Sequence, residues 1–269
     1  MGLKIFTISS ELESCRRLGL PTFVGEIPEY VDEYKGDIAI RWGNSRSCFS
    51  RSDIKKEFPH VLQTAKAIRA NCDKYASKKK LEEAGISVPK THVGNIPIGV
   101  KCVVRPFEHS SGKEFSIQSG PYELGPEEYG SEYLRSKKEV RIWFVGRSTL
   151  MARRCPLKGT EEKDQICRSN WGYDFCYGDK VPKDIFDSVM KGAEKLNLKF
   201  GAVDAILQNG VAHILEYNTA CSIDLVRLER FFKKGLMKLL RDEFGKDFEK
   251  LAELNKLNKE GYKFADSDF

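Results

Sequence analysis

The sequence predicts an α+β fold that follows a short parallel α/β unit. In that unit, apolar runs typical of strands alternate with a helical segment, an order typical of a small parallel sheet. Farther along the chain, strand patterns follow one another directly as hairpins, and one strongly amphipathic helix is expected over 183–196. The chain has 269 residues, of which 41% are apolar, so it can bury the core of one large domain or two smaller ones.

The α/β unit is expected to occupy residues 1–70. A serine precedes the apolar positions of its first helix as an N-cap, and a glycine follows them. Its strand at 37–43 runs into a polar loop, RWGNS (41–45), at the edge where open α/β sheets bind ligands. A plain turn explains that loop at least as well. Strands are expected at 3–8, 21–24 and 37–43, and helices at 9–20 and 59–71.

The region 71–130 is expected to form the first of two α+β subdomains. A helix over 73–83 should end at Gly85, because glycine commonly terminates helices. A β-branched, alternating stretch then predicts a strand, and a polar turn should lead from it into a return strand. Extended structure is expected at 91–93, 99–107 and 115–118.

The second subdomain is expected over 131–245, and the end of the last helix with a tail over 246–269. Asn209-Gly210, between two apolar stretches, is a strong signal for a hairpin with a two-residue turn. Strands are expected at 129–134, 139–145, 149–154, 200–207 and 211–218, a loop-rich stretch at 156–180, and a helix at 223–257 with a break at Gly245.

The stretch HILEYNTACS (213–222) changes abruptly from apolar to polar. Because residues i and i+2 share a face of a strand, Glu216 and Asn218 should point the same way, within reach of Asp204 on the partner strand. Two carboxylates and an amide, with no His or Cys, suit a hard cation such as Mg²⁺, which usually also takes phosphate oxygens. Burying two carboxylates close together is costly unless a cation neutralises them. A strand end that meets solvent is the alternative interpretation.

Basic side chains that could bind phosphate lie near the predicted strands. Each one alone is explained by a solvated charge, but beside an acidic hairpin they indicate a site for a polyanion. These side chains are Arg105, Arg141, Arg153, Arg154 and Arg168, the last followed by Ser169 and Asn170.

Composition argues against several classes of protein. We expect no transmembrane helix, no secretory signal and no myristoylation, for which Phe6 stands in place of serine or threonine. The eight cysteines form no CxxC pair, so we expect reduced thiols, no zinc and a cytoplasmic protein. The net charge of +6 suits nucleic acid or a small polyanion, but no nucleic-acid-binding motif is present, and the short KKK run (78–80) is interpreted as ordinary solvated lysines.

Several stretches, in the same order along 71–225, resemble motifs of the ATP-grasp superfamily. They are most similar to the ribosomal-protein glutamate ligases and glutathione-synthetase-like carboxylate–amine ligases. The resemblance implies an ATP-grasp fold, in which two α+β subdomains clasp ATP, after a short Rossmann-like α/β unit. The stretches are NCDKYASKKKLEEAGISVPKT, VVRPFEHSSGKEF, SEYL, EVRIWFVG, CRSN and FGAVDAIL…HILEYNTACS.

The resemblance also implies roles for individual residues. Asp204, Glu216 and Asn218 would bind two Mg²⁺ ions, for which Mn²⁺ could substitute, with Glu216 as the bridge. Nucleotide contacts are implied for Lys74 and Arg105 (phosphates), Ser111 and Gly112 (the loop over the phosphates), Glu132 and Tyr133 (adenine, the latter through its backbone), Glu139 (near the nucleotide), and Arg168, Ser169 and Asn170 (phosphate and ribose).

Three positions depart from the family's pattern. Arg105 stands where lysine is usual, which keeps the charge and adds a bidentate fork. The loop at 109–112 has one glycine where the family often has several, so its close approach to phosphate is in question. Cys221-Ser222 replaces a common Pro-Gly, and Cys221 is expected to be a small buried side chain rather than a nucleophile.

The activity implied is ligation of a carboxylate to an amine, with ATP forming an acyl phosphate first. Arg141 or Arg168 would stabilise the oxyanion of the second step. The substrates would be an amino acid or a peptide, either a small molecule or a peptide or protein terminus, without a membrane or nucleic-acid partner. The alternatives are an ATP-grasp kinase that phosphorylates a small molecule, and a nucleotide-binding protein without catalysis.

Overall fold

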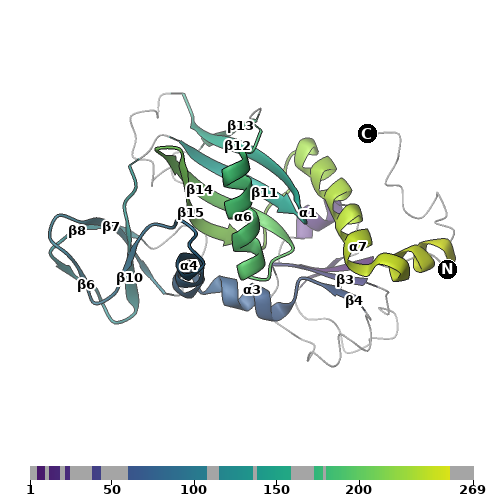
Figure 1. Cartoon of the computed structure of the whole chain (residues 1–269), viewed down its shortest axis with the longest axis horizontal. Helices are drawn as coiled ribbons and strands as arrows, with labels where there is room; N and C mark the ends of the chain where they lie inside the picture. Colours follow the sequence, from purple (N-terminus) through teal and green to yellow (C-terminus); the bar gives the residue numbers. More distant parts are fainter. Residues whose placement is uncertain are drawn as a thin grey trace.

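The chain folds around three main β-sheets that lie in a row in Figure 1. The small sheet lies at the left, the five-stranded sheet in the centre, and the N-terminal sheet beside the long last helix at the right. Among the described residues, no helix is long and apolar enough to cross a membrane. The computed structural model describes residues 5–9, 12–18, 22–24, 38–43, 60–107, 115–135, 138–158, 173–177 and 180–254, with only the backbone at Phe6, Ile8, Ser9, Leu12, 22–24 and Tyr173 and from 246 on.

The N-terminal sheet is parallel, as the sequence predicts. Its order is β2 (Thr22–Val24), β1 (Ile5–Ser9), β3 (Ile38–Trp42), β4 (His60–Leu62), and α1 spans Leu12–Arg17. The expectation of a helix over 59–71 is wrong at its beginning. The first residues pair with β3 as β4, and α3 (Ala65–Cys72) starts only after Thr64, whose hydroxyl accepts a hydrogen bond from the Ala67 N–H (3.2 Å).

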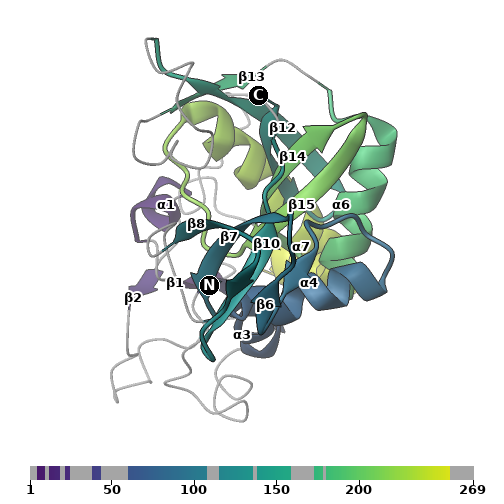
Figure 2. The same ribbon diagram turned by 90° about the vertical axis from the view of Figure 1, so that its left-hand side faces the viewer.

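The small sheet is antiparallel and follows α4 (Lys74–Glu83). Asp73 caps this helix by accepting a hydrogen bond from the Ala76 N–H at 2.8 Å. A two-stranded ribbon, which the sequence did not predict, lies beside the sheet in Figure 2. The sheet order is β5 (Thr91–His92), β10 (Glu128–Glu132), β7 (Lys101–Pro106), β8 (Ser116–Ser119), and the ribbon is β6 (Asn95–Ile96) with β9 (Tyr122–Glu123).

The five-stranded sheet is antiparallel and includes β13, a strand within a stretch that was expected to be loop. α6 (Lys183–Lys195) covers one face of the sheet (Figure 1), and α7 (Val226–Leu254) packs on the other. The predicted break in the last helix is confirmed, because Gly245 has φ 45° and ψ −119°. The sheet order is β13 (Tyr173–Tyr177), β12 (Ser148–Pro156), β11 (Glu139–Val145), β14 (Phe200–Gln208), β15 (Val211–Asn218).

Tyr217 fixes β15 against α6. Its hydroxyl donates to the Val189 carbonyl at 2.8 Å and passes directly over Gly192. A Cβ at Gly192 would come within 2.1 Å of that oxygen, so the close approach requires glycine. This contact sets the orientation of the strand on which the predicted metal-binding residues lie.

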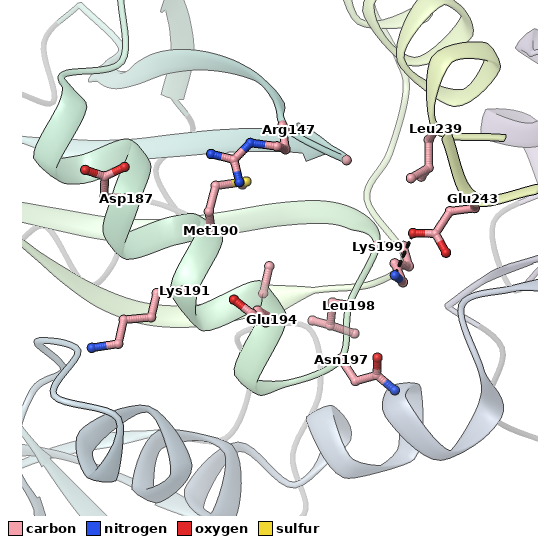
Figure 3. Close-up of a pocket in the computed structure, with 12 residues that line it drawn as sticks. Arg147, Asp187, Met190, Lys191, Glu194, Asn197, Leu198, Lys199, Leu239 and Glu243 are labelled. Carbon is pink, nitrogen blue, oxygen red and sulfur yellow. Dashed lines mark hydrogen bonds and ion pairs between the residues drawn. The ribbon is translucent and has the colours of Figure 1, made fainter. Parts of the chain in front are cut away.

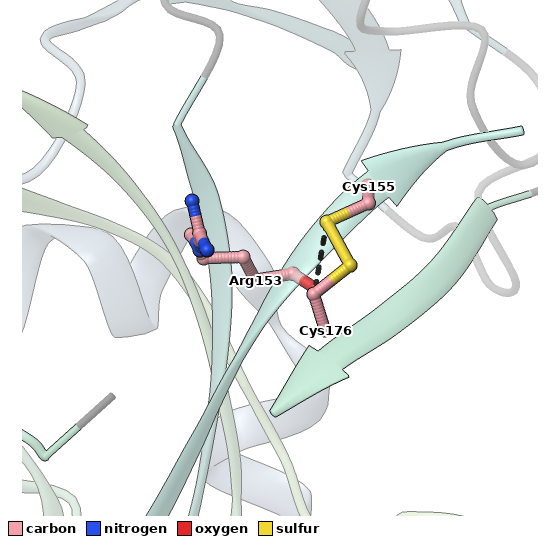
Figure 4. The surroundings of a disulfide bond; sticks show 3 residues. All are labelled: Arg153, Cys155 and Cys176. Atoms are coloured by element: carbon pink, nitrogen blue, oxygen red, sulfur yellow. Dashed lines mark hydrogen bonds between the residues drawn. A yellow bond between two sulfur atoms is a disulfide. The ribbon is translucent and has the colours of Figure 1, made fainter. Parts of the chain in front are cut away.

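The expectation that all cysteines are reduced is wrong for one pair. Cys155 on β12 and Cys176 on β13 form a disulfide, shown with neighbouring Arg153 in Figure 4. The two strands pair edge to edge, so residues offset along them come close enough to join. Among the described cysteines, Cys72 and Cys102 are free thiols.

Candidate active site

A β-bulge places the acidic side chains of the hairpin on one face. Asp204 lies directly opposite Glu216, but the next pair is Ala205 with Ile214, so Leu215 has no opposite residue. In a regular strand Ile214 and Glu216 would point to the same face. The extra residue instead lets Ile214 and Tyr217 both face α6, and turns Glu216 to the opposite face together with Asp204.

Asn218 completes this group, because it follows Glu216 by two residues. Its Nδ2 donates to Asp204 Oδ2 at 3.2 Å. The structure therefore brings together the three side chains that the sequence suggested as metal ligands.

Asp204 is also held by two arginines. Arg141 Nε and Nη2 donate to its two carboxylate oxygens, both at 2.7 Å, and Arg154 Nη2 reaches both oxygens at 3.0 Å. Asp204 is only 4% exposed. Burial alone would raise the pKa of Asp204, but the charges and hydrogen bonds of Arg141 and Arg154 outweigh burial and hold that pKa below its usual value.

Arg154 joins Asp204 to a second buried carboxylate. Its Nη1 forms an ion pair with Glu139, which begins β11 and is 6% exposed. Two carboxylates and two guanidinium groups thus balance one another on the face of the sheet opposite α6. Arg141, expected to stabilise an oxyanion, uses Nε and Nη2 to hold Asp204 in this arrangement.

The junction of α3 and α4 attaches to β15 beside Glu216. Lys74 Nζ donates to the Tyr217 carbonyl at 2.9 Å and lies 3.7 Å from Glu216 Oε2. Asn71 Nδ2 donates to the same carbonyl at 2.8 Å. The expected phosphate-binding lysine therefore lies next to the expected bridging carboxylate.

A second lysine of α4 faces the small sheet. Lys78 Nζ donates to Ser131 Oγ at 2.7 Å and lies 5.6 Å from the centre of the Tyr129 ring. Tyr129 is paired with Arg105 across β10 and β7, and Ser131 follows Tyr129 by two residues. The side chains of Ser131, Tyr129 and Arg105 therefore share one face of the small sheet. No sequence pattern marked Lys78 as a site residue, because it stands in a lysine run that is typical of a solvated helix surface.

The residues expected to hold adenine lie at the end of β10. His92 Nε2, on neighbouring β5, donates to Glu132 Oε1 at 3.0 Å, and the Glu132 side chain is 33% exposed. The Tyr133 N–H donates to the Lys101 carbonyl at 2.8 Å. A nucleotide that used the Tyr133 N–H would have to displace that bond.

The donor set has the chemistry of a Mg²⁺ site. Within the described parts of the chain, no three His, Cys, Asp or Glu side chains are grouped as metal ligands, so the third donor here has to be the amide of Asn218. Carboxylate and amide oxygens on one face are what a hard cation requires. Because arginines and Asn218 occupy both oxygens of Asp204, a cation bound there would replace at least one of these donors.

Several residues that the sequence suggested for the site do not join the cluster around Asp204. Arg153 is exposed, and Arg41 is buried at the end of β3. Cys221 is buried, as expected, and its carbonyl accepts a hydrogen bond from Trp42 Nε1 at 3.2 Å. Ser111, Gly112, Arg168, Ser169 and Asn170 lie outside the described residues.

A cavity of about 510 Å³ lies away from this cluster (Figure 3). Its walls are the exposed side of α6, the turn between β11 and β12, and part of α7. Acidic and basic side chains alternate in it, and Lys199 and Glu243 pair at 2.6 Å. None of the residues that line it belongs to the predicted site.

No model of a known protein family matches the chain, and no curated protein matches its sequence. Solved structures do match its backbone. A D-alanine–D-alanine ligase from Bacillus anthracis has 14% identity and a TM-score of 0.59, covering 93% of this chain and 100% of its own. A ligase from Chryseobacterium gregarium, described as a RiPP-associated ATP-grasp ligase in complex with ADP and a leader and core peptide, has 14% identity and a TM-score of 0.59, covering 90% and 97%.

A RimK-domain ATP-grasp protein from Sphaerobacter thermophilus is similar to the same extent. It has 14% identity and a TM-score of 0.57, and the match covers 88% of this chain and 98% of its own. The Bacillus anthracis ligase has also been solved with ATP. At these identities the likeness concerns the course of the backbone and not individual side chains.

Proposed function

Because the chain has the ATP-grasp fold, we propose that it is an ATP- and Mg²⁺-dependent carboxylate–amine ligase. It would form an amide or peptide bond through an acyl phosphate, with an amino acid or a peptide as substrate. The nucleotide would lie between the small sheet and the five-stranded sheet, whose facing parts belong to the proposed subdomains 71–130 and 131–245. Solved neighbours of this fold are named as ligases, one of them in complex with a peptide.

One observation carries this proposal. The oxygen-only group Asp204, Glu216 and Asn218 is turned to one face by the bulge, and Lys74 reaches that face from α4. Acidic ligands for a cation next to a lysine are what a metal–phosphate site needs. A hairpin that merely ended in solvent would not bury Asp204 under two arginines.

The proposed reaction has two steps. An oxygen of the substrate carboxylate attacks the γ-phosphorus of ATP and ADP leaves; the amine then attacks the acyl carbon, phosphate leaves, and the amine loses its proton. Lys74 and Arg105 would neutralise the phosphates, and Arg141 or Arg168 would stabilise the oxyanion of the second step. Mg²⁺ held by Asp204, Glu216 and Asn218 would neutralise charge that develops on the transferred group.

Trapping with hydroxylamine tests the proposal. The protein is incubated with Mg-ATP and pools of amino acids and peptides, and ADP release and mass spectra identify the acid that is used. With that acid and hydroxylamine, we expect a hydroxamate that forms only in the presence of ATP. A phosphorylated hydroxyl product, or nucleotide binding without turnover on any acid and amine, would contradict ligation.

His92 is expected to position Glu132 for the amino group of adenine. Removing its hydrogen bond frees the carboxylate to rotate, so His92→Leu should weaken ATP binding by about three- to tenfold, a net loss typical of one hydrogen bond. His92→Gln, which keeps a donor, should retain most of the affinity. Titration calorimetry with ATP and GTP checks this, and an unchanged ATP affinity in His92→Leu would disprove the positioning role.

A further inference from the structure

Lys78 is a buried cation that the proposed reaction does not use. It lies on α4 one turn after Lys74, on the same side of the helix, and is 8% exposed. α4 runs between the small sheet and the five-stranded sheet (Figure 1), and Lys78 bonds to Ser131 on β10 whereas Lys74 bonds to the Tyr217 carbonyl on β15. Ser131 and the ring of Tyr129 hold the ammonium group in place.

The charges around Lys78 are unbalanced. Arg105 from β7 and Lys74 from α4 repel its ammonium group, and Glu216 from β15 attracts it. Tyr129, from β10, is itself kept protonated because burial raises its pKa to about 12. Burial is the largest cause of the lowered pKa of Lys78, and the charge of Arg105 is the next. The attraction of Glu216 raises this pKa by less, so the pKa lies at about 8. Among the described residues, Lys74, Lys78 and Arg105 therefore repel one another, and Glu216 is the carboxylate that attracts Lys78.

We propose that Lys78 is a third cation of the phosphate site, fixed by Ser131, which supplies positive charge to bound nucleotide alongside Lys74 and Arg105. This inference rests on the proposed nucleotide site but not on the reaction that occurs there. A polyphosphate is the class of ligand that relieves mutual repulsion among three cations. Its arrival favours the charged form of Lys78, so binding above pH 8 is coupled to uptake of a proton from the buffer.

Calorimetry of a nonhydrolysable Mg-ATP analogue in two buffers of different ionisation enthalpy measures this uptake. At pH 8.5 the phosphates of the analogue are fully ionised, so they take up no proton themselves. A lysine with a pKa near 8 is then largely neutral, and we expect uptake of about half a proton per nucleotide. At pH 7 the same lysine is already charged, and uptake should fall to about a tenth of a proton or less.

Three variants separate a charge effect from a packing effect. Lys78→Met should weaken binding about tenfold at pH 7, the effect of one charge at close range in a medium of intermediate dielectric. The loss should shrink as the pH rises past 8. Lys78→Arg should keep the affinity and lose the proton uptake, because arginine does not titrate in this range. Lys79→Met, which removes the next lysine of α4 and its ion pair with Glu82, is the matched control and should bind and take up protons as the wild type does.

The outcomes distinguish this inference from the proposed function. Proton uptake in the wild type that disappears in Lys78→Arg supports it, even if no acyl phosphate is ever trapped. Lys78→Met with wild-type affinity at pH 7, or a wild type that binds nucleotide without taking up protons at pH 8.5, overturns it while leaving ligation untouched. Should Lys78→Met fail to fold, the proton uptake of Lys78→Arg decides the matter.

Discussion

Replacing Glu216 by glutamine is expected to lower acyl-phosphate formation by about 10²- to 10³-fold, the loss typical of removing one group that stabilises developing charge. Glutamine keeps the length of the side chain and loses the negative charge that the proposed Mg²⁺ requires. ADP release in the presence of the acid substrate measures the change. Retained ADP release at saturating substrate would count against the proposed bridging role.

The fold should survive this substitution. The Glu216 side chain is 30% exposed, and its contact with Lys74 spans 3.7 Å, so the ion pair stabilises the fold by less than about 1 kcal/mol. The thermal midpoint should therefore stay within about 2 °C of the wild-type value. Glu83→Gln removes an exposed carboxylate from α4 and is the matched control, expected to change neither rate nor midpoint.

Asp204 would be a poorer choice for the same experiment. Its carboxylate accepts hydrogen bonds from Arg141, Arg154 and Asn218, so Asp204→Asn would disturb folding and ligand binding together. Glu216 is more exposed than Asp204, so a loss of activity at Glu216 is easier to assign to chemistry.

Local signals in the sequence were sufficient for the elements that carry the site. Asn209 and Gly210 both have positive φ, at 52° and 78°, as the predicted two-residue turn requires. Asp73 caps α4 and so puts Lys74 in its first turn, close to β15. These features depend on neighbouring residues, which is why a short stretch of sequence could indicate them.

The bulge at Leu215 could not be predicted in that way. Counting residues from the turn would place Asp204 opposite Leu215, with Glu216 on the other face. No glycine or proline marks the irregularity, and the bulge accompanies the packing of Tyr217 over Gly192 on α6, which lies far away in the sequence. Asp204 and Glu216 therefore share a face, as expected, but they do so because of the bulge and not because of their distance from the turn.

Two further differences between the expected and the observed structure also arise from contacts between distant parts of the chain. β13 carries aromatic residues at alternate positions, Tyr173, Phe175 and Tyr177, but this run of five residues lies in a loop-rich stretch and forms a strand by pairing with β12. Lys78 belongs to a run of lysines in sequence, and only the approach of β10 buries it. Burial of a charged group follows from tertiary contacts, which a single sequence does not contain.

Replacing Arg154 by methionine is expected to destabilise the fold by about 3–5 kcal/mol at pH 7, the loss typical of removing one partner from a buried ion pair. Arg154 contacts both Glu139 and Asp204, and its side chain is 12% exposed. Without it, Asp204 would keep its ion pair with Arg141, whereas Glu139 would lose its ion pair with Arg154. Urea midpoints with an unchanged m-value measure the loss.

Arg153 offers a matched control on the same strand. It is exposed and points to the other face of β12, so Arg153→Met removes the same charge and should cost about 0.5 kcal/mol or less. Equal losses in the two variants would mean that general charge, not the buried cluster, is responsible.

The pH dependence identifies the cause of the loss. Arg141 and Arg154 hold the pKa of Asp204 below its usual value against the effect of burial, so this group contributes stability above pH 4 or so that disappears as the pH falls through its folded value. Arg154→Met gives up part of that contribution, so its deficit in unfolding free energy relative to the wild type should be full above pH 4 or so and should narrow as the pH falls below about 4. A constant deficit would instead point to lost packing of the arginine's aliphatic stem.

A second substitution distinguishes the two partners of Arg154. Glu139→Gln removes one of the stranded carboxylates, so adding it to Arg154→Met should restore part of the lost stability, whereas in the wild-type background it should destabilise. The sign of that coupling follows from charge balance alone. If Glu139→Gln cost the same in both backgrounds, Arg154 and Glu139 would not act as a pair, and Asp204 alone would account for the loss.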